Sequence, residues 1–271
     1  MSTNCNNNCS SCQENCDRRQ SDVAKVPTNA KSTIRKVIAV ISGKGGVGKS
    51  LVTSLLAVKA RRDGQKVAIM DADITGPSIP KTFHLEGMAE SDDEYIYPVE
   101  TKTGIRVMSI NLLLEDETKP VIWRGPVIGG AVKQFWTDVV WSDVDTMFID
   151  CPPGTGDVPL TLFQSLPIDG IIVVTTPQEL VQTIVAKACN MAEMMNVPVL
   201  GIVENMSYYV CDSCQTRHYI FGESQVEKVA KEFNIPKTVR LPIDKSIREY
   251  VDNGDIESYN GNWMEEISKL I

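Results

Sequence analysis

The stretch SGKGGVGKS at positions 42–50 constrains this chain more than any other. It follows the apolar run KVIAVIS, which predicts a buried strand, and it opens a segment that predicts a helix. In this strand–loop–helix context the pattern G-x-x-x-x-G-K-[ST] is typical of a loop whose backbone N–H groups surround phosphate oxygens. Glycines let the backbone curl that tightly, and the helix N-terminus adds positive potential. The sequence therefore predicts a nucleotide-phosphate site inside an α/β domain.

Within this loop, two side chains have definite expected partners. Lys49 is placed to contact the β- and γ-phosphates, and the Ser50 hydroxyl to bind Mg²⁺. The nucleotide is expected to contact Gly43, Gly45, Gly46, Val47, Gly48, Lys49, Ser50 and Leu51. Lys44 is a second lysine, which an ordinary phosphate-binding loop does not need. The loop pattern by itself leaves the purpose of Lys44 open.

Short apolar runs alternate with helical patterns along the rest of the chain. Runs rich in Val and Ile lie at 36–42, 66–71, 105–110, 145–150, 170–176, 198–205 and 238–242. Helical patterns lie at 49–62, 124–139, 178–195, 223–233 and 243–252. Continuous apolar strands suit a sheet that is covered on both faces. The alternation predicts a doubly wound, mostly parallel α/β sheet in one domain, which we take to span 34–271.

Acidic side chains follow two of the predicted strands. Asp150 closes the run DTMFID and is followed by CPPGTGD, while Asp71 and Asp73 lie in MDADITGPS. Ligands gather at the carboxyl ends of strands in such a sheet, so these side chains are expected near the phosphate loop. We assign Asp150 and Asp71 to the Mg²⁺ site and Asp73 to positioning or activating the attacking water. The alternative is that these aspartates only cap turns.

Composition narrows the class of protein. The formal net charge of −8 and the pI near 4.9 argue against sequence-independent binding to nucleic acid. No apolar run approaches the roughly 20 residues that span a bilayer, and the N-terminus lacks the apolar stretch of a signal peptide. We therefore expect a cytoplasmic protein that binds neither nucleic acid nor membrane. Its eight cysteines are then expected to serve metal or redox roles rather than disulfides.

Cys211 and Cys214 form a C-x-x-C pair, which we expect in a loop between a strand and a helix. Two thiolates are half of the ligand set of a tetrahedral metal site or a four-iron cluster. A twofold homodimer would supply the other half. A redox dithiol, or zinc with His218 as a third ligand, would suit the same spacing. The spacing alone does not decide among these alternatives.

Residues 1–33 differ in composition from the remainder, being rich in Asn and Ser and poor in large apolar side chains. We expect a flexible tail unless a metal organises it. The tail carries four closely spaced cysteines, a complete ligand set for a cluster or for zinc: Cys5, Cys9, Cys12 and Cys16. We favour a second [4Fe–4S] cluster over zinc.

The glycine-flanked Lys44 in KGGVGKS resembles the deviant Walker A signature. Together with DADITGPS, DCPPGTGD and VENMSYYVCDSCQTRHYIFG, it resembles the Mrp/ApbC-type P-loop ATPases, which are iron–sulfur cluster carriers. The resemblance covers 34–271. It implies a homodimer in which Lys44 reaches the partner's bound phosphates, and it implies adenine recognition by Asn205.

The same resemblance implies the cofactors and the activity. They are ATP, Mg²⁺ and a [4Fe–4S] cluster bridged between two Cys211/Cys214 pairs, with slow ATP hydrolysis and cluster transfer to apo iron–sulfur proteins. Some carriers of this family have an N-terminal four-cysteine motif, but with wider spacing than here. Cys151 stands where the family has an apolar residue, and we expect it to pack as a small hydrophobe.

Two other functions use the same nucleotide loop. An ATP-driven electron donor resembling nitrogenase iron protein would also bridge a cluster, but it should keep that cluster through turnover. A septum-site or partition ATPase would need a membrane-binding helix or a basic surface. The C-terminal NWMEEISKLI is amphipathic but has two glutamates and one lysine, which suits anionic lipid poorly.

Overall fold

The computed structural model describes residues 25–74, 76–114, 125–154, 156–177 and 181–270. Within these residues, nine strands form one sheet in the order β3-β4-β2-β5-β1-β6-β7-β8, and β9 pairs with β7. The strands are β1 (Thr33–Ser42), β2 (Val67–Asp71), β3 (Val99–Glu100), β4 (Arg106–Met108), β5 (Asp143–Asp150), β6 (Gly170–Thr175), β7 (Val199–Val210), β8 (Arg217–His218) and β9 (Thr238–Pro242). Only the β3–β4 and β7–β8 pairings of this sheet are antiparallel. The predicted doubly wound, mostly parallel sheet is confirmed.

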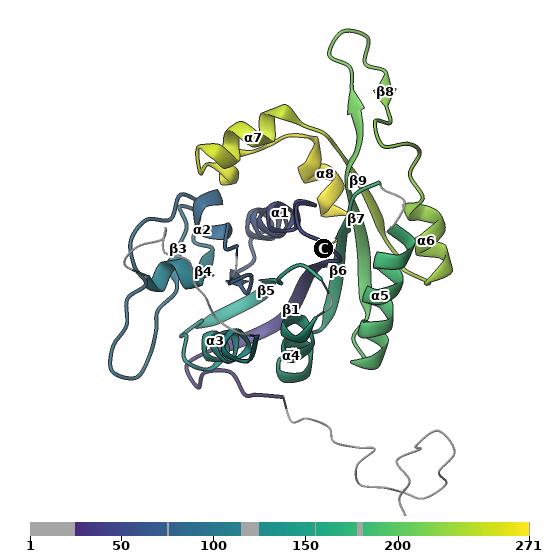
Figure 1. Cartoon of the computed structure of the whole chain (residues 1–271). Coiled ribbons are helices and arrows are strands. Elements are labelled where there is room, and N and C mark those ends of the chain that lie inside the picture. Colours follow the sequence, from purple (N-terminus) through teal and green to yellow (C-terminus); the bar gives the residue numbers. More distant parts are fainter. Residues whose placement is uncertain (1–24, 75, 115–124, 155, 178–180, 271) are drawn as a thin grey trace, which may run out of the picture.

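Helices cover both faces of this sheet (Figure 1). One face carries α1 (Lys49–Arg62), α2 (Ile79–Thr82), α7 (Lys245–Asp252) and α8 (Asn262–Ser268). The other carries α3 (Gly125–Thr137), α4 (Asp157–Ser165), α5 (Val181–Met194) and α6 (Val226–Glu232). Two 3₁₀ turns, η2 (Ile110–Leu113) and η3 (Ile256–Ser258), complete the described elements. Among the described residues, no helix is both long and apolar enough to cross a bilayer.

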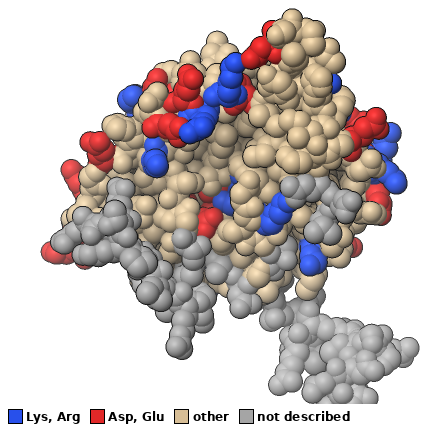
Figure 2. All heavy atoms as spheres, turned by 45° about the horizontal axis from the view of Figure 1, so that its top comes forward, with Lys and Arg blue, Asp and Glu red and all other residues tan. Residues whose placement is uncertain are grey.

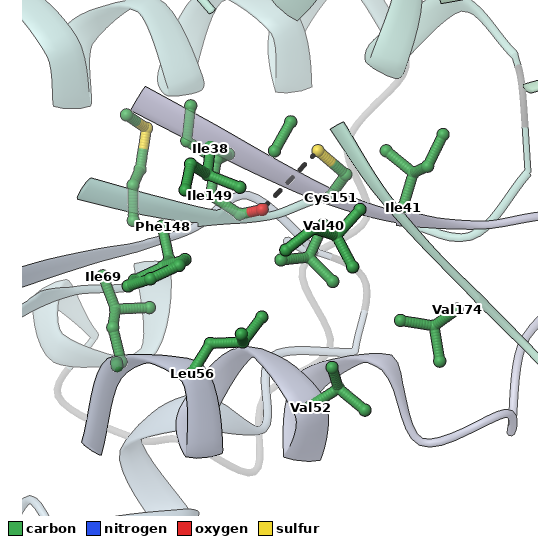
Figure 3. Packing of buried hydrophobic residues seen from close by; sticks show 14 of the residues in the cluster. Ile38, Val40, Ile41, Val52, Leu56, Ile69, Phe148, Ile149, Cys151 and Val174 are labelled. Carbon is green, nitrogen blue, oxygen red and sulfur yellow. Dashed lines mark hydrogen bonds between the residues drawn. The ribbon is translucent and has the colours of Figure 1, made fainter. Parts of the chain in front are cut away.

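The core lies between the sheet and these helices. Figure 3 shows Leu56 of α1 pointing toward Ile69 and Phe148 of the sheet, and Val52 pointing toward Val40; all five side chains are buried. Cys151 is fully buried on the side of the sheet away from α1, with its Sγ 3.8 Å from the carbonyl oxygen of Ile149. It packs as a small hydrophobe, as expected.

Two predicted strands end at the wrong residue, and the sequence missed helix α4. The strand predicted at 105–110 ends at Met108, because the chain turns into η2. Helix α4 was not predicted from the sequence. Strand β7 continues five residues beyond its predicted end at 205 and carries the chain into a hairpin with β8. In Figure 1 this hairpin projects from the body of the domain.

The predicted tail at 1–33 lies mostly outside the described residues, and its last part contacts α3 and α4. The backbone N–H of Val26 donates to the carbonyl of Ser165 at 2.8 Å, and the indole N–H of Trp136 donates to the carbonyl of Val26 at 2.9 Å. The amide of Asn29 donates to the carbonyl of Thr137 at 3.1 Å. Residues 25–32 are therefore held against the domain before β1 begins.

Candidate functional site

The glycine-rich loop follows β1, which lies between β5 and β6 in the sheet. The strand order extends from β1 in both directions, so the end of β1 is a topological switch point. Ligands bind at such a switch point in doubly wound sheets. Gly48 precedes α1 with φ 84°, and a Cβ there would lie 2.4 Å from Nδ2 of Asn205. A Cβ at Gly43 would lie 2.2 Å from Cγ2 of Ile184. Both positions therefore require glycine.

A cleft of ≈ 340 Å³ lies over this loop. Its lining includes all the loop residues from Lys44 to Leu51, together with Asp73, Pro153 and Val251. Gly45 and Gly46 are exposed, while Lys44 is half-buried. On the face that Figure 2 presents, acidic and basic side chains are interspersed rather than gathered into a field of one sign.

Lys49 and Asp150 form a buried ion pair at the base of this cleft. The Lys49 Nζ lies 2.8 Å from Asp150 Oδ1, and the two side chains are 6% and 0% exposed. The hydroxyl of Ser50 donates to Asp150 Oδ2 at 2.5 Å, and that of Thr53 donates to Oδ1 at 2.9 Å. Asp150 thus has three partners from the first turns of α1, which fixes its orientation beneath the loop.

Asp71 and Asp73 complete the acidic group. Asp71 is the register partner of Asp150 on the adjacent strand, and its carboxylate accepts the Ser109 hydroxyl at 3.1 Å and the Asp73 N–H at 3.2 Å. Asp73 Oδ2 lies 3.6 Å from Lys49 Nζ. Asp73 and Asp150 therefore flank Lys49, and Asp71 lies beside Asp150 on the adjacent strand. Carboxylate oxygens are ligands that Mg²⁺ prefers.

The buried carboxylates and the lysine change one another's protonation. Burial, and next the charge of Asp150, raise the pKa of Asp71 to about 8. Burial acts to lower the pKa of Lys49, but the attraction of Asp150 outweighs it and the pKa is raised. The raised pKa favours the protonated form of Asp71 relative to a free aspartate, and a bound divalent ion would favour loss of the proton.

Asn205 connects the nucleotide loop to β7. Its side chain is 2% exposed, and its amide donates to the carbonyl of Val47 at 2.9 Å. Its side-chain oxygen accepts the N–H of Met206 at 2.7 Å. The amide group retains a second N–H and the oxygen a second lone pair, which is the pair of functions that an adenine edge needs.

Cys211 and Cys214 lie in the turn of the β7–β8 hairpin. The sequence predicted them in a loop between a strand and a helix. That prediction missed the short strand β8, which follows the two cysteines. Their ligand atoms and one of His218 all lie within 4.8 Å of one another. Cys214 and His218 are exposed and Cys211 is half-buried. The Thr216 hydroxyl, 3.3 Å from Cys214 Sγ, is the main cause that lowers the pKa of Cys214.

An apolar strip follows these potential ligands directly. Tyr219, Ile220 and Phe221 are 41%, 60% and 47% exposed. The Tyr219 ring contacts the ring of Tyr208 edge to face, and the guanidinium of Arg217 lies 4.6 Å from the Tyr208 centroid. Such a strip next to a metal-type cluster suits contact with another protein.

Two residues of this site were missed in the sequence. Thr53, one helical turn after Lys49, binds Asp150; Ser109, just after β4, binds Asp71. The rule that polar residues at strand ends converge could have found Ser109. Cys189, half-buried on α5, lines a separate cleft. The tail cysteines Cys5, Cys9, Cys12 and Cys16 lie outside the described residues.

Comparisons with known proteins place this chain among P-loop NTPases. A family model described as ParA, NUBPL iron-transfer P-loop NTPase, matches residues 33–271. The chain is 48% identical over 233 residues to an iron-sulfur cluster carrier protein of Methanocaldococcus jannaschii, covering 85% of this chain and 80% of that protein. It is 42% identical over 259 residues to a protein of the same description from Clostridium perfringens, covering 93% and 90%.

Solved structures show the same relationship. A nucleotide-binding protein of Archaeoglobus fulgidus, in complex with ADP, is 45% identical with a TM-score of 0.78, over 86% of this chain and 91% of that one. The septum site-determining protein MinD of Pyrococcus horikoshii, complexed with Mg-ADP, has a TM-score of 0.59 at 19% identity, over 88% and 94%. The second likeness concerns the fold alone.

Proposed function

The chain belongs to the family of NUBPL-type iron-transfer P-loop NTPases, and from this premise we propose that it is an ATP-hydrolysing iron–sulfur cluster carrier. In this proposal the chain binds ATP and Mg²⁺, holds a [4Fe–4S] cluster between two copies, and transfers the cluster to apo-proteins. The observation that carries it is the Cys211/Cys214 pair, half-buried and exposed respectively, on a hairpin of a P-loop domain. The relatives described as iron-sulfur cluster carriers support it.

The nucleotide role rests on the buried group beneath the loop. We assign Lys49 to the β- and γ-phosphates and Ser50, Asp71 and Asp150 to Mg²⁺, directly or through water. Ser50 and Asp150 already lie 2.5 Å apart in hydrogen-bond contact, so a cation between them would replace that hydrogen bond. Asp73 lines the cleft beside Lys49, where it can orient the attacking water.

Lys44 is assigned to the nucleotide of a second copy. It is half-buried and lies next to the exposed Gly45 and Gly46, at the outer part of the loop. A cation supplied from a partner neutralises charge that develops in the transition state, as an arginine finger does. Hydrolysis then requires that two copies meet, which couples the nucleotide to the arrangement of the dimer.

Cluster binding also requires two copies. One chain offers two thiolates in the described hairpin, whereas a [4Fe–4S] cluster takes four. A twofold axis beside the hairpin places two such pairs together, and the exposed strip of Tyr219, Ile220 and Phe221 adds apolar contact next to them. A cluster held at such an interface is accessible to the thiolates of an apo-protein. The tail cysteines are proposed to bind a second cluster or zinc.

The test is to measure iron and acid-labile sulfide after anaerobic reconstitution of the full chain and a Cys211→Ala/Cys214→Ala variant. We expect the variant to lose about two irons per chain, because half of a shared four-iron cluster belongs to each chain. If the tail binds a cluster, the counts fall from about six to about four; if it binds zinc, from about two to about zero. Cys189→Ala, which removes a thiol distant from the hairpin, should leave the count unchanged. An unchanged count in the double variant would remove the bridging cluster.

Transfer is tested by incubating the reconstituted protein with an apo [4Fe–4S] enzyme and measuring the activity that the enzyme regains. A carrier loses iron as the acceptor gains it. A protein that keeps its cluster through ATP turnover would instead be an electron donor.

A further inference from the structure

The hairpin brings a third potential metal ligand to the two thiolates within one chain. The ligand atoms of Cys211, Cys214 and His218 all lie within 4.8 Å of one another. A cluster shared by two chains does not need His218, since four thiolates satisfy it. The position of this imidazole therefore calls for a separate explanation.

Strand register puts His218 on the same face of the hairpin as Cys211. His218 pairs with Tyr209 across the antiparallel ladder, so these two side chains point to the same face. Cys211 is two residues after Tyr209 and keeps that face, since side chains alternate along a strand. The backbone N–H of Cys211 donates to the carbonyl of Thr216 at 3.0 Å, which closes the turn between them.

The opposite face of the hairpin has a different composition. Arg217 lies over the Tyr208 ring, and the ring of Tyr219 contacts that of Tyr208. Arg240 of β9 lies 5.5 Å from the Tyr219 centroid and so ties this face to the sheet. The aromatic and cationic side chains thus hold the hairpin from one side, and Cys211 and His218 lie on the other, with the Cys214 sulfur within 4.8 Å of their ligand atoms.

The three ligand atoms are close enough to bind a single ion. In a tetrahedral site with metal–sulfur bonds of about 2.3 Å, two sulfurs lie about 3.8 Å apart, which is compatible with ligand atoms that all lie within 4.8 Å of one another. Thiolates on different irons of a cubane cluster are separated further, because each points outward from its own corner. Two sulfurs and one imidazole also suit borderline-soft ions such as Zn²⁺, Co²⁺ and Fe²⁺, and not Mg²⁺ or Ca²⁺.

We propose that Cys211, Cys214 and His218 of one chain bind a single divalent transition-metal ion of the Zn²⁺ or Co²⁺ type. Three protein ligands leave one tetrahedral position for water or for a thiolate of another molecule. The site goes beyond the proposed carrier function, since it needs one copy of the chain and no nucleotide. The ion and the bridging cluster use the same two thiolates, so each excludes the other.

The test is a titration of the full-length protein with Co²⁺ under anaerobic conditions, followed by the visible absorption of tetrahedral, thiolate-bound Co²⁺. Every variant carries Ser at the four tail cysteines, so that the tail thiolates do not compete. The informative variant is His218→Asn, and the matched control is His84→Asn, since these are the two histidines of the chain. His84 is exposed near Glu86 at φ 51°, which Asn tolerates.

We expect one Co²⁺ per chain in the parent and in His84→Asn, and at least about 10-fold weaker binding in His218→Asn. Equal affinity in His218→Asn and the parent, one Co²⁺ per two chains, or no tetrahedral Co²⁺ in the parent would each overturn the proposal. ADP binding serves as the check that each variant is folded. Because the bridging cluster needs only the thiolates, His218→Asn should still gain about two irons per chain on reconstitution. A failure of the carrier function would show in that iron count and not in the Co²⁺ titration.

Discussion

The nucleotide cleft and the cysteine hairpin differ in how many of the groups that each site needs are supplied by one chain. In the cleft, Lys49 and Asp150 are 6% and 0% exposed, and Asp150 is held by Ser50, Thr53 and Lys49. In the hairpin, Cys214 is exposed and its thiol donates to the Thr216 hydroxyl at 3.3 Å. The two regions also differ in position: in Figure 1 the glycine-rich loop lies within the layers of the domain, whereas the hairpin projects beyond them.

This contrast bears on where the proposed second copy would take part. A buried charge is stable only when its partners are already present, so the cleft has to be assembled before nucleotide arrives. A cysteine that reaches the surface, as Cys214 does, tolerates an incomplete ligand set, because water solvates its sulfur. The hairpin is therefore the region that a second protein can complete, and the predictions below separate the two regions by the size and kind of effect.

The largest effect is expected in the cleft, at Lys49. Lys49→Met removes the charge that offsets Asp150 and the contact proposed for the phosphates. We expect ATP hydrolysis to fall by about 10³-fold and the free energy of unfolding to fall by about 3 kcal/mol. Phosphate release and urea unfolding measure the two. Lys59→Met, which removes a surface ion pair with Asp63 on the same helix, should cost at most about 1 kcal/mol and leave hydrolysis intact. Equal losses in both variants would contradict the assigned role.

The second prediction concerns Lys44, on the outer part of the same loop. Lys44→Ala should lower hydrolysis by about 10²–10³-fold while nucleotide affinity is retained, because the side chain is proposed to act on the partner's phosphates. Steady-state rates at several chain concentrations, with nucleotide binding by calorimetry, check this. In the parent the rate per chain should rise with concentration as dimers form. Lys81→Ala, an exposed lysine of α2, is the control; a rate that never depends on concentration would exclude action between copies.

Sequence reasoning succeeded where one pattern fixes both the element and its side chains. The helix predicted at 49–62 agrees with α1 residue for residue, because the loop motif defines its start at Lys49. Strand ends placed the three aspartates near the loop, but only the register shows that Asp71 and Asp150 are neighbours. Local pattern could not give these distances.

Sequence reasoning failed where pairing with another strand decides the structure. After Asn205 the residues MSYYV lack the continuous apolar pattern of a buried strand, so β7 was ended too early. The two residues of β8 carry no strand signal of their own. His218 could be proposed as a ligand from spacing, but its face depends on pairing with Tyr209, which is a property of the folded hairpin.

The third prediction compares the buried Cys151, next to Asp150, with the exposed Cys214 of the hairpin. Burial raises the pKa of Cys151 to about 12, whereas the Thr216 hydroxyl lowers the pKa of Cys214. The thiolate is the nucleophile, so a lowered pKa gives more reactive sulfur at a given pH and a raised one gives less. In metal-free protein at neutral pH, iodoacetamide should modify Cys214 at least about 100-fold faster than Cys151, as followed by peptide mapping. Unfolding in urea should abolish the difference, and comparable rates in the native state would contradict the burial of Cys151.

The smallest effect is expected at Asn205, the residue through which the two regions meet. Strand β7 carries Asn205 against the nucleotide loop and, six residues on, Cys211 in the hairpin. Asn205→Ala leaves the Val47 carbonyl and the Met206 N–H without their side-chain partner, which should lower the free energy of unfolding by about 1–2 kcal/mol. Urea unfolding measures this, and Asn190→Ala, at an exposed position on α5, should be close to neutral.

The part of the chain in which Asn205→Ala lowers local stability tests whether β7 couples the nucleotide loop to the hairpin. Met206 has φ 56° and the β7–β9 register shifts between Glu204 and Tyr208, so the strand is irregular just after Asn205. An irregularity of this kind disrupts the ladder locally and bends the strand. Hydrogen exchange should therefore rise in the nucleotide loop of Asn205→Ala and stay unchanged at Val210 and Cys211. Faster exchange in the hairpin as well would show that β7 transmits strain past the bulge, and that the cluster site senses the nucleotide loop within one chain rather than through the dimer.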